Sequence, residues 1–151
     1  MFNLFKKPAP VIEDKIFGKL KYFTRNNSSL GFFSGNILFE PLNKNIECLI
    51  DADTGGPKVE QQEFYKTIQK KYRGLITSAI PLIKSEFEAW DENLKITEFD
   101  KDFNLIAISI PVLDKTPVIW DLAFNIVQDE GGHHLTITFQ DFEPKEALID
   151  G

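Results

Sequence analysis

The sequence predicts an α+β fold: an antiparallel sheet of about six strands, in the order strands–helix–strands, with one face covered by a long, kinked helical segment. Three observations lead to this fold class. Apolar and polar residues alternate before residue 51 and after residue 105, which is the spacing of half-buried strands. Between these regions, residues 64–90 carry apolar side chains three and four positions apart, as in an amphipathic helix. The strand segments are joined by short connections, which favours antiparallel pairing.

The length of 151 residues fits one domain. Residues 1–14 contain Pro8 and Pro10 and show no period, so we expect a poorly ordered lead-in. Residues 15–142 are expected to form the single α+β domain, and residues 143–151 a tail.

The first half of the chain predicts three strands separated by turn-forming residues. The first begins at Ile16, the second covers residues 32–39, and the third covers residues 46–50. Cys48 lies on the inward face of the third strand, which is typical of a small core residue. We expect the other face of the sheet to meet water, with these polar residues on it: Lys19, Lys21, Glu47, Asp121 and Asn125.

The helical segment follows Pro57, a residue suited to the first position of a helix. Gly74 and Pro81 interrupt its pattern, and Pro81 removes a backbone donor. We therefore expect a kink at Pro81, or two consecutive helices. A basic stripe on this segment is interpreted as its solvated face: Lys66, Lys70 and Arg73.

Strand patterns return in the second half, with a short strand over residues 94–99 and longer ones over 106–112, 118–126 and 135–139. The last two are joined by a glycine-containing hairpin loop. We expect one buried core to include Trp120, Phe124, Ile137 and Phe139.

Seventeen basic and twenty-three acidic residues give a net charge of −6, which disfavours binding to nucleic acid or anionic membrane. No apolar run is long enough to span a bilayer. The single cysteine, Cys48, excludes an intrachain disulfide and favours a reducing compartment. We expect a cytoplasmic protein, and the oligomeric state stays open.

Two aspartates, Asp51 and Asp53, stand where the third strand meets the helical segment. Asp53-Thr54-Gly55 matches the short signature of aspartic proteases, but those enzymes need two such carboxylates. The same stretch begins like a calcium loop and lacks its bidentate glutamate. A strand-to-helix turn is the favoured interpretation.

No metal site and no cofactor are predicted. The two histidines, His133 and His134, are adjacent, so on a strand they point to opposite faces and do not share a metal. The chain has no Ser-His-Asp grouping, phosphate-binding glycine loop or zinc spacing. This pattern favours a non-enzymatic protein, although a dispersed active site stays open.

Acidic residues accumulate between residues 86 and 102. If they share a surface, they would steer a basic protein partner toward the molecule. The predicted partner-binding residues are Asp91, Glu92, Asp100 and Asp102. The competing interpretation is a solvated loop whose charges only keep the protein soluble.

Three stretches together carry a family resemblance: residues 17–20 (FGKL), residues 50–66 with Asp51, Asp53 and a Gly-Pro pair, and residues 118–124 (VIWDLAF). Over about residues 16–142 the chain resembles small uncharacterised bacterial proteins, a domain of unknown function, and some of these are similar to immunity proteins of toxin systems. The resemblance implies a bacterial, non-enzymatic protein-binding module, for example an immunity protein that masks a basic toxin. The alternative is a small hydrolase or ligand-binding domain with a dispersed carboxylate site near Asp51 and Asp53.

Overall fold

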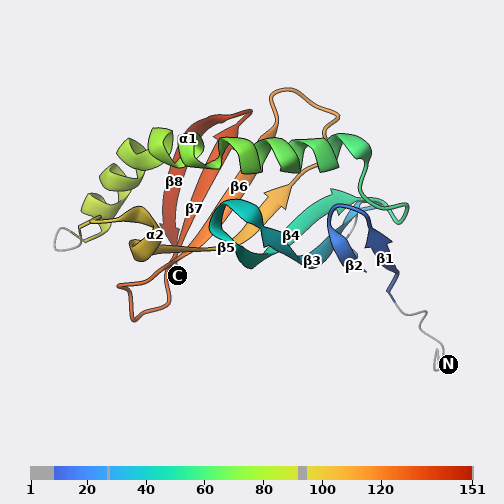
Figure 1. Cartoon of the computed structure of the whole chain (residues 1–151), viewed down its shortest axis with the longest axis horizontal. Coiled ribbons are helices and arrows are strands. Elements are labelled where there is room, and N and C mark those ends of the chain that lie inside the picture. Colours follow the sequence, from blue (N-terminus) through green and yellow to red (C-terminus); the bar gives the residue numbers. More distant parts are fainter. Residues whose placement is uncertain (1–8, 27, 92–94, 151) are drawn as a thin grey trace.

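The computed structural model describes residues 9–26, 28–91 and 95–150. One sheet and one long helix make up most of this part of the chain (Figure 1). In chain order the elements are β1 (Val11–Asp14), β2 (Gly18–Phe23), β3 (Gly31–Phe39), the 3-10 helix η1 (Glu40–Leu42), β4 (Lys44–Ala52), α1 (Val59–Trp90), α2 (Phe99–Asp102), β5 (Phe103–Ile110), β6 (Ile119–Ile126), β7 (His134–Gln140) and β8 (Glu143–Asp150).

The described strands form one eight-stranded mixed sheet, in which they lie side by side in chain order. Every neighbouring pair is antiparallel except β4 and β5, which are parallel and meet through pairs such as Cys48↔Ile108. The prediction of about six antiparallel strands is therefore wrong in both number and type. Alternation reveals that a segment is a strand but not its direction. Here α1 carries the chain back across the sheet, so that β5 starts beside the start of β4.

Strands β1 and β8 are the two strands that the sequence pattern did not predict. Strand β1 lies in the segment expected to be a lead-in and pairs with β2 through Glu13↔Lys19. Strand β8 lies in the segment expected to be a tail and pairs with β7 through Ile137↔Ala147. A shift in the β7–β8 register, between Thr138 and Phe139, breaks the alternation that would have marked β8 in the sequence.

The expected strand over residues 94–99 does not form in the described part of that range. Residues 95–98 have no strand structure, and Phe99 begins the short helix α2. Residue 94 lies outside the described residues.

Helix α1 is continuous over 32 residues and passes through Pro81 without dividing into two helices. Pro81 occupies an exposed position. Figure 1 shows the ribbon bending over its last turns, beyond the middle of the helix. The inward side of α1 buries a regular row of apolar residues against one face of the sheet: Ile68, Tyr72, Leu75, Ile76, Ala79, Ile83 and Phe87.

The predicted core of the second half is confirmed, because Trp120, Phe124, Ile137 and Phe139 are all at most 1% exposed. Trp120 stacks on Phe139 with 4.6 Å between ring centroids. The indole N–H of Trp120 donates a 2.6 Å hydrogen bond to the backbone oxygen of Asp141, so burial leaves no polar atom unpaired there. The predicted water-facing side is confirmed as well: Lys19, Lys21, Glu47 and Asn125 are exposed and Asp121 is half-buried.

Candidate functional site

The carboxyl ends of the parallel strands β4 and β5 meet the start of α1 at one end of the sheet. In open sheets covered by helices, ligands commonly bind outside the carboxyl ends of parallel strands, where a crevice forms. A pocket of about 230 Å³ lies at this place. It is lined by Leu30, Asp51, Ala52, Asp53, Gly56, Lys58, Glu60, Gln61, Val112, Leu113 and Asp114.

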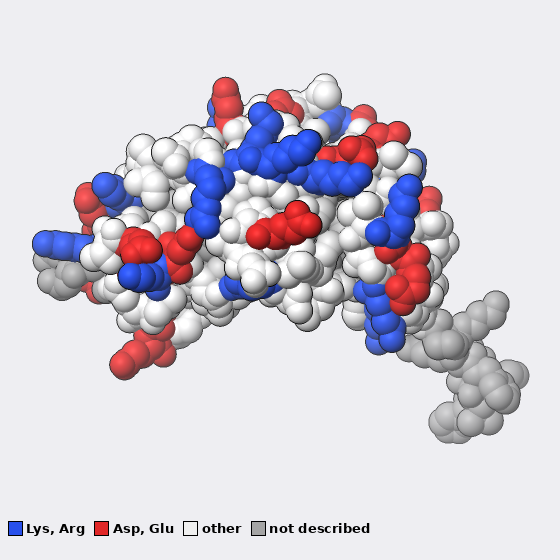
Figure 2. All heavy atoms as spheres, in the orientation of Figure 1, with Lys and Arg blue, Asp and Glu red and all other residues white. Residues whose placement is uncertain are grey.

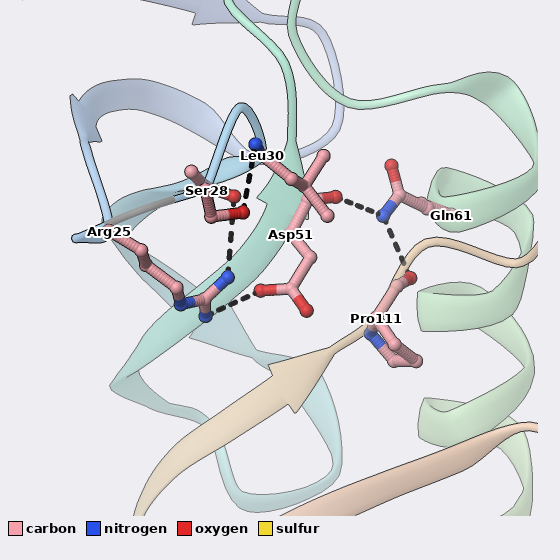
Figure 3. A network of polar contacts seen from close by, with 7 residues as sticks. Arg25, Ser28, Leu30, Asp51, Gln61 and Pro111 are labelled. Atoms are coloured by element: carbon pink, nitrogen blue, oxygen red, sulfur yellow. Dashed lines mark hydrogen bonds and ion pairs between the residues drawn. The ribbon is translucent and has the colours of Figure 1, made fainter.

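Gln61 holds the three elements of this site together. Its side chain is buried at 2% exposure. The amide nitrogen donates to the backbone oxygens of Asp51 (2.8 Å) and Pro111 (2.9 Å), which lie at the ends of the two parallel strands (Figure 3). The amide oxygen accepts a 3.0 Å hydrogen bond from the backbone N–H of Lys58 at the start of α1. One amide therefore fixes the wall of the pocket.

The carboxylate of Asp51 forms an ion pair with Arg25. The guanidinium donates to Asp51 Oδ1 at 2.7 Å (Figure 3), and it lies 4.8 Å from the ring centre of Phe32. Both side chains are partly exposed, so the pair adds little to stability. Its main effect is to hold the Asp51 carboxylate at the rim of the pocket.

The remaining acidic residues come from separate segments. Asp53 Oδ1 accepts a 2.9 Å hydrogen bond from the backbone N–H of Gly55, which confirms the expected turn before the helix. Glu60 lies in the first turn of α1, and Asp114 lies in the loop after β5. Within the described residues, no ion pair involves Asp53, Glu60 or Asp114. Four carboxylates and one ammonium group, that of Lys58, line the pocket, so its charge is negative.

A metal centre has no support in the described part of the chain. No three His, Cys, Asp or Glu side chains among residues 9–26, 28–91 and 95–150 are grouped so that they could hold a metal ion. The four carboxylates that line the pocket come from three separate segments.

The predicted acidic surface after α1 is only partly present. Asp102 is buried, and it accepts hydrogen bonds from the backbone N–H of Thr97 (2.7 Å) and the side-chain amide of Gln128 (2.9 Å). Asp102 therefore does not belong to an exposed acidic surface, because its carboxylate organises the loop before β5. Asp100 is paired with Arg73 at 2.6 Å. Asp91 is half-buried at the end of α1, and Glu92 lies outside the described residues.

The two histidines occupy different environments. His133 Nδ1 lies 2.8 Å from Asp129 Oδ2, and its ring meets Trp90 edge-on at 5.0 Å. His134 begins β7 opposite Asn125. Cys48 is fully buried, and burial raises the pKa of its thiol well above the usual range. These side chains lie away from the pocket.

No family model matches the chain, and neither the curated proteins nor the solved structures include a significant match. The family resemblance given above therefore stays a prediction. In the described residues, no helix is both long enough and apolar enough to cross a membrane.

Proposed function

We propose that the protein is a binding module that takes a cationic group of a partner protein into the pocket at the carboxyl ends of β4 and β5. The observation that supports this proposal most is the lining of the pocket. Acidic side chains from three separate segments surround a hollow of about 230 Å³ that also has apolar walls, including Leu30 and Val112. An ammonium or guanidinium group on an aliphatic stem is complementary to such a pocket, because its charge suits the carboxylates and its stem suits the apolar walls.

Electrostatic attraction favours a cationic ligand both at long range and inside the pocket. The net charge of −6 attracts a positive partner over distances of about a Debye length. Inside the pocket, the carboxylates of Asp53, Glu60 and Asp114 supply acceptors for a charged donor. The docking point therefore differs from the acidic segment suggested by the sequence, while the basic partner remains the same. A basic toxin is one partner of this chemistry, as the family resemblance implies.

The partners of Asp51 and Asp53 favour a binding function over the hydrolase alternative. In a carboxylate active site, Asp51 and Asp53 would have to act on the substrate as general acid, general base or nucleophile. Asp51 is instead tied to Arg25, and Asp53 is tied to its own turn. Both carboxylates thus serve as fixed acceptors at the rim.

The proposal is tested with side-chain probes and a pair of variants. N-acetyl-lysine amide and N-acetyl-arginine amide are titrated into the protein and followed by backbone amide NMR shifts. We expect shifts confined to Leu30 and to residues 51–61 and 111–114. In the double variant Asp53→Asn and Asp114→Asn, affinity should fall about fivefold, equivalent to ~1 kcal/mol, because two acceptor charges are lost. Asparagine at position 53 still accepts the Gly55 hydrogen bond, so the turn is kept.

A second double variant, Glu130→Gln and Glu146→Gln, removes the same charge from exposed positions outside the pocket. It should bind as the unmodified protein does. Equal losses in the two double variants would show that only net charge matters. Probe-induced shifts elsewhere, or no binding at millimolar probe, would also contradict the proposal.

A further inference from the structure

The second half of strand β3 has one open edge. Strand β2 pairs with β3 only from Phe23↔Phe32 to Lys21↔Ser34. Strand β3 then continues to Phe39 and pairs only with β4 on its other side. Residues 18–21 of β2 pair with β1 on the opposite edge, and the carbonyl of Lys19 lies close to Gly35 of β3 without forming a further strand pair. Among the described residues, no strand pairs with the outer edge of residues 36–39.

Main-chain groups of this half-strand face the open edge. The hydroxyl of Tyr65 on α1 donates a 3.1 Å hydrogen bond to the backbone oxygen of Leu38. The backbone N–H of Tyr22 donates to Pro10 on the β1 side. The next residue inward, Lys21, and its partner Ser34 on β3 therefore face each other. The N–H and C=O of one strand residue point to the same side, and the direction repeats every second residue. The backbone groups of Leu38 and Asn36 therefore both point to the open edge. Burial raises the pKa of the Tyr65 hydroxyl, which keeps it a donor.

A groove of about 570 Å³ runs along this edge. Its walls are the turn between β1 and β2, the edge of β3, and the first half of α1, from Tyr65 to Gln69. A second hollow of about 460 Å³ continues it, because both are lined by Glu40, Lys66 and Gln69. The groove is lined by Lys15, Ile16, Phe17, Gly18, Asn36, Ile37, Leu38, Glu40, Tyr65, Lys66 and Gln69.

The sides of the groove are basic, although the whole chain is acidic. Lys15 and Lys66 line the first hollow and Lys70 the second, against a single carboxylate, that of Glu40. In the described part of the chain, neither Lys15 nor Lys70 takes part in an ion pair, and the pair of Lys66 with Glu63 is exposed to solvent. Figure 2 shows Lys and Arg side chains in a row along α1.

We propose that this groove is a docking site for an extended, acidic segment of a partner protein, which adds a strand to the open edge of β3. Strand addition uses main-chain hydrogen bonds for affinity and side chains for selectivity. The backbone of Asn36 and the N–H of Leu38 offer the main-chain groups, since the carbonyl of Leu38 already accepts from Tyr65. At about 3.3 Å per residue, the open edge accommodates roughly four residues of an added strand. Carboxylates of the added segment meet the ammonium groups of Lys15, Lys66 and Lys70. This site is separate from the acidic pocket and does not depend on the proposed function.

The test uses two acetylated heptapeptides, one of alternating Glu and Val and the other of alternating Lys and Val. Binding is followed by backbone amide NMR shifts and by amide hydrogen exchange. We expect the Glu peptide alone to bind, with shifts at residues 15–18, 36–38 and 65–70, and with slower exchange at Leu38. Its affinity should fall as salt rises, because the attraction is between charges.

Two double variants separate the groove from net charge. Lys66→Ala with Lys70→Ala should weaken binding of the Glu peptide about tenfold. Lys84→Ala with Lys115→Ala removes two exposed lysines outside both hollows and should leave the affinity unchanged. Equal effects of the two variants, or equal binding of the Lys peptide, would overturn the acidic partner. Unchanged exchange at Leu38 would overturn strand addition. No binding at millimolar peptide, or a groove covered by a second copy of the chain in solution, would overturn the proposal as a whole.

Discussion

Gln61 is a polar residue whose importance depends on partners far away in the chain. It bonds the ends of β4 and β5 to the start of α1, across separations of 10 and 50 residues. Its neighbour Gln62 is also buried and donates a 3.0 Å hydrogen bond to the carboxylate of Asp14, the last residue of β1. In the sequence, two adjacent glutamines near a helix start resemble solvent-facing residues. The one available signal is the position of Gln61 three residues after the helix cap, where Glu or Gln often bonds back to the backbone.

Replacing Gln61 by alanine should lower the free energy of unfolding by about 1–3 kcal/mol, because buried backbone oxygens lose their donor. Urea denaturation measures the change. Gln69→Ala is the matched control on the same helix, since it removes one exposed hydrogen bond, from the backbone N–H of Glu40. It should cost much less. Equal losses would show that the buried position of Gln61 has no special role.

The carboxylate of Asp129 makes the stability of the folded state depend on pH. Its carboxylate accepts hydrogen bonds from the backbone N–H of His133 (2.5 Å) and of Gly131 (3.2 Å), and the first of these is the main reason that its pKa lies below the usual range. A carboxyl with a lowered pKa in the folded state stabilises that state above its ordinary pKa, near 4. The stabilisation is lost as the pH falls through the lower, folded-state pKa.

We therefore expect Asp129→Asn to lower the urea midpoint of unfolding at pH 6. The difference in midpoint between the variant and the unmodified protein, called the gap below, should narrow below about pH 4. Denaturation series between pH 6 and pH 2.5 measure this gap. The exposed neighbour provides the control, since Glu130→Gln should show a small gap at every pH. A gap for Asp129→Asn that does not change with pH would contradict the assignment.

Single strands depart from simple alternation where a bulge intervenes. In β5 the buried residues are Phe103 and Leu105, then Ile108 and Ile110. The register shifts between Leu105 and Ala107, so the inward positions change from odd to even numbers. The sequence pattern placed Ile106 on the inward face with Ile108 and Ile110, and the structure leaves Ile106 half-buried. An unpaired extra residue has no signature in hydrophobic periodicity.

Strand β8 provides a direct test of the corrected sheet. Ala147 is 8% exposed on the inner face, while the adjacent Leu148 is 45% exposed on the other face. Ala147→Asp should destabilise the protein by about 3 kcal/mol or more, because it buries an unpaired charge. Leu148→Asp should change stability little.

Thermal or urea denaturation of both variants checks this prediction. The pair is matched, because each introduces one aspartate in the same strand. If the residues after 142 formed only a tail, the two substitutions would have similar, small effects. That result would contradict the eighth strand.

At the scale of the molecule, the sheet of the described residues consists of two antiparallel meanders, β1–β4 and β5–β8, joined side by side through the parallel pair β4 and β5. Helix α1 makes this junction possible, since its length returns the chain to the starting end of β4 (Figure 1). Both candidate sites follow from this arrangement. The pocket lies where the two parallel strands end and α1 begins, and the groove lies where β2 stops pairing with β3.

The sequence by itself determined the local features of this protein. Apolar spacing predicted the long helix, most of the strands and the buried cluster around Trp120, because side-chain period depends only on nearby residues. The sequence also singled out Asp51 and Asp53 at the strand-to-helix turn, where the pocket lies. Only the tertiary structure decided the direction of β5, the burial of Asp102, the role of Gln61 and the open edge of β3. Each of these depends on contacts between distant segments, which local periodicity does not encode.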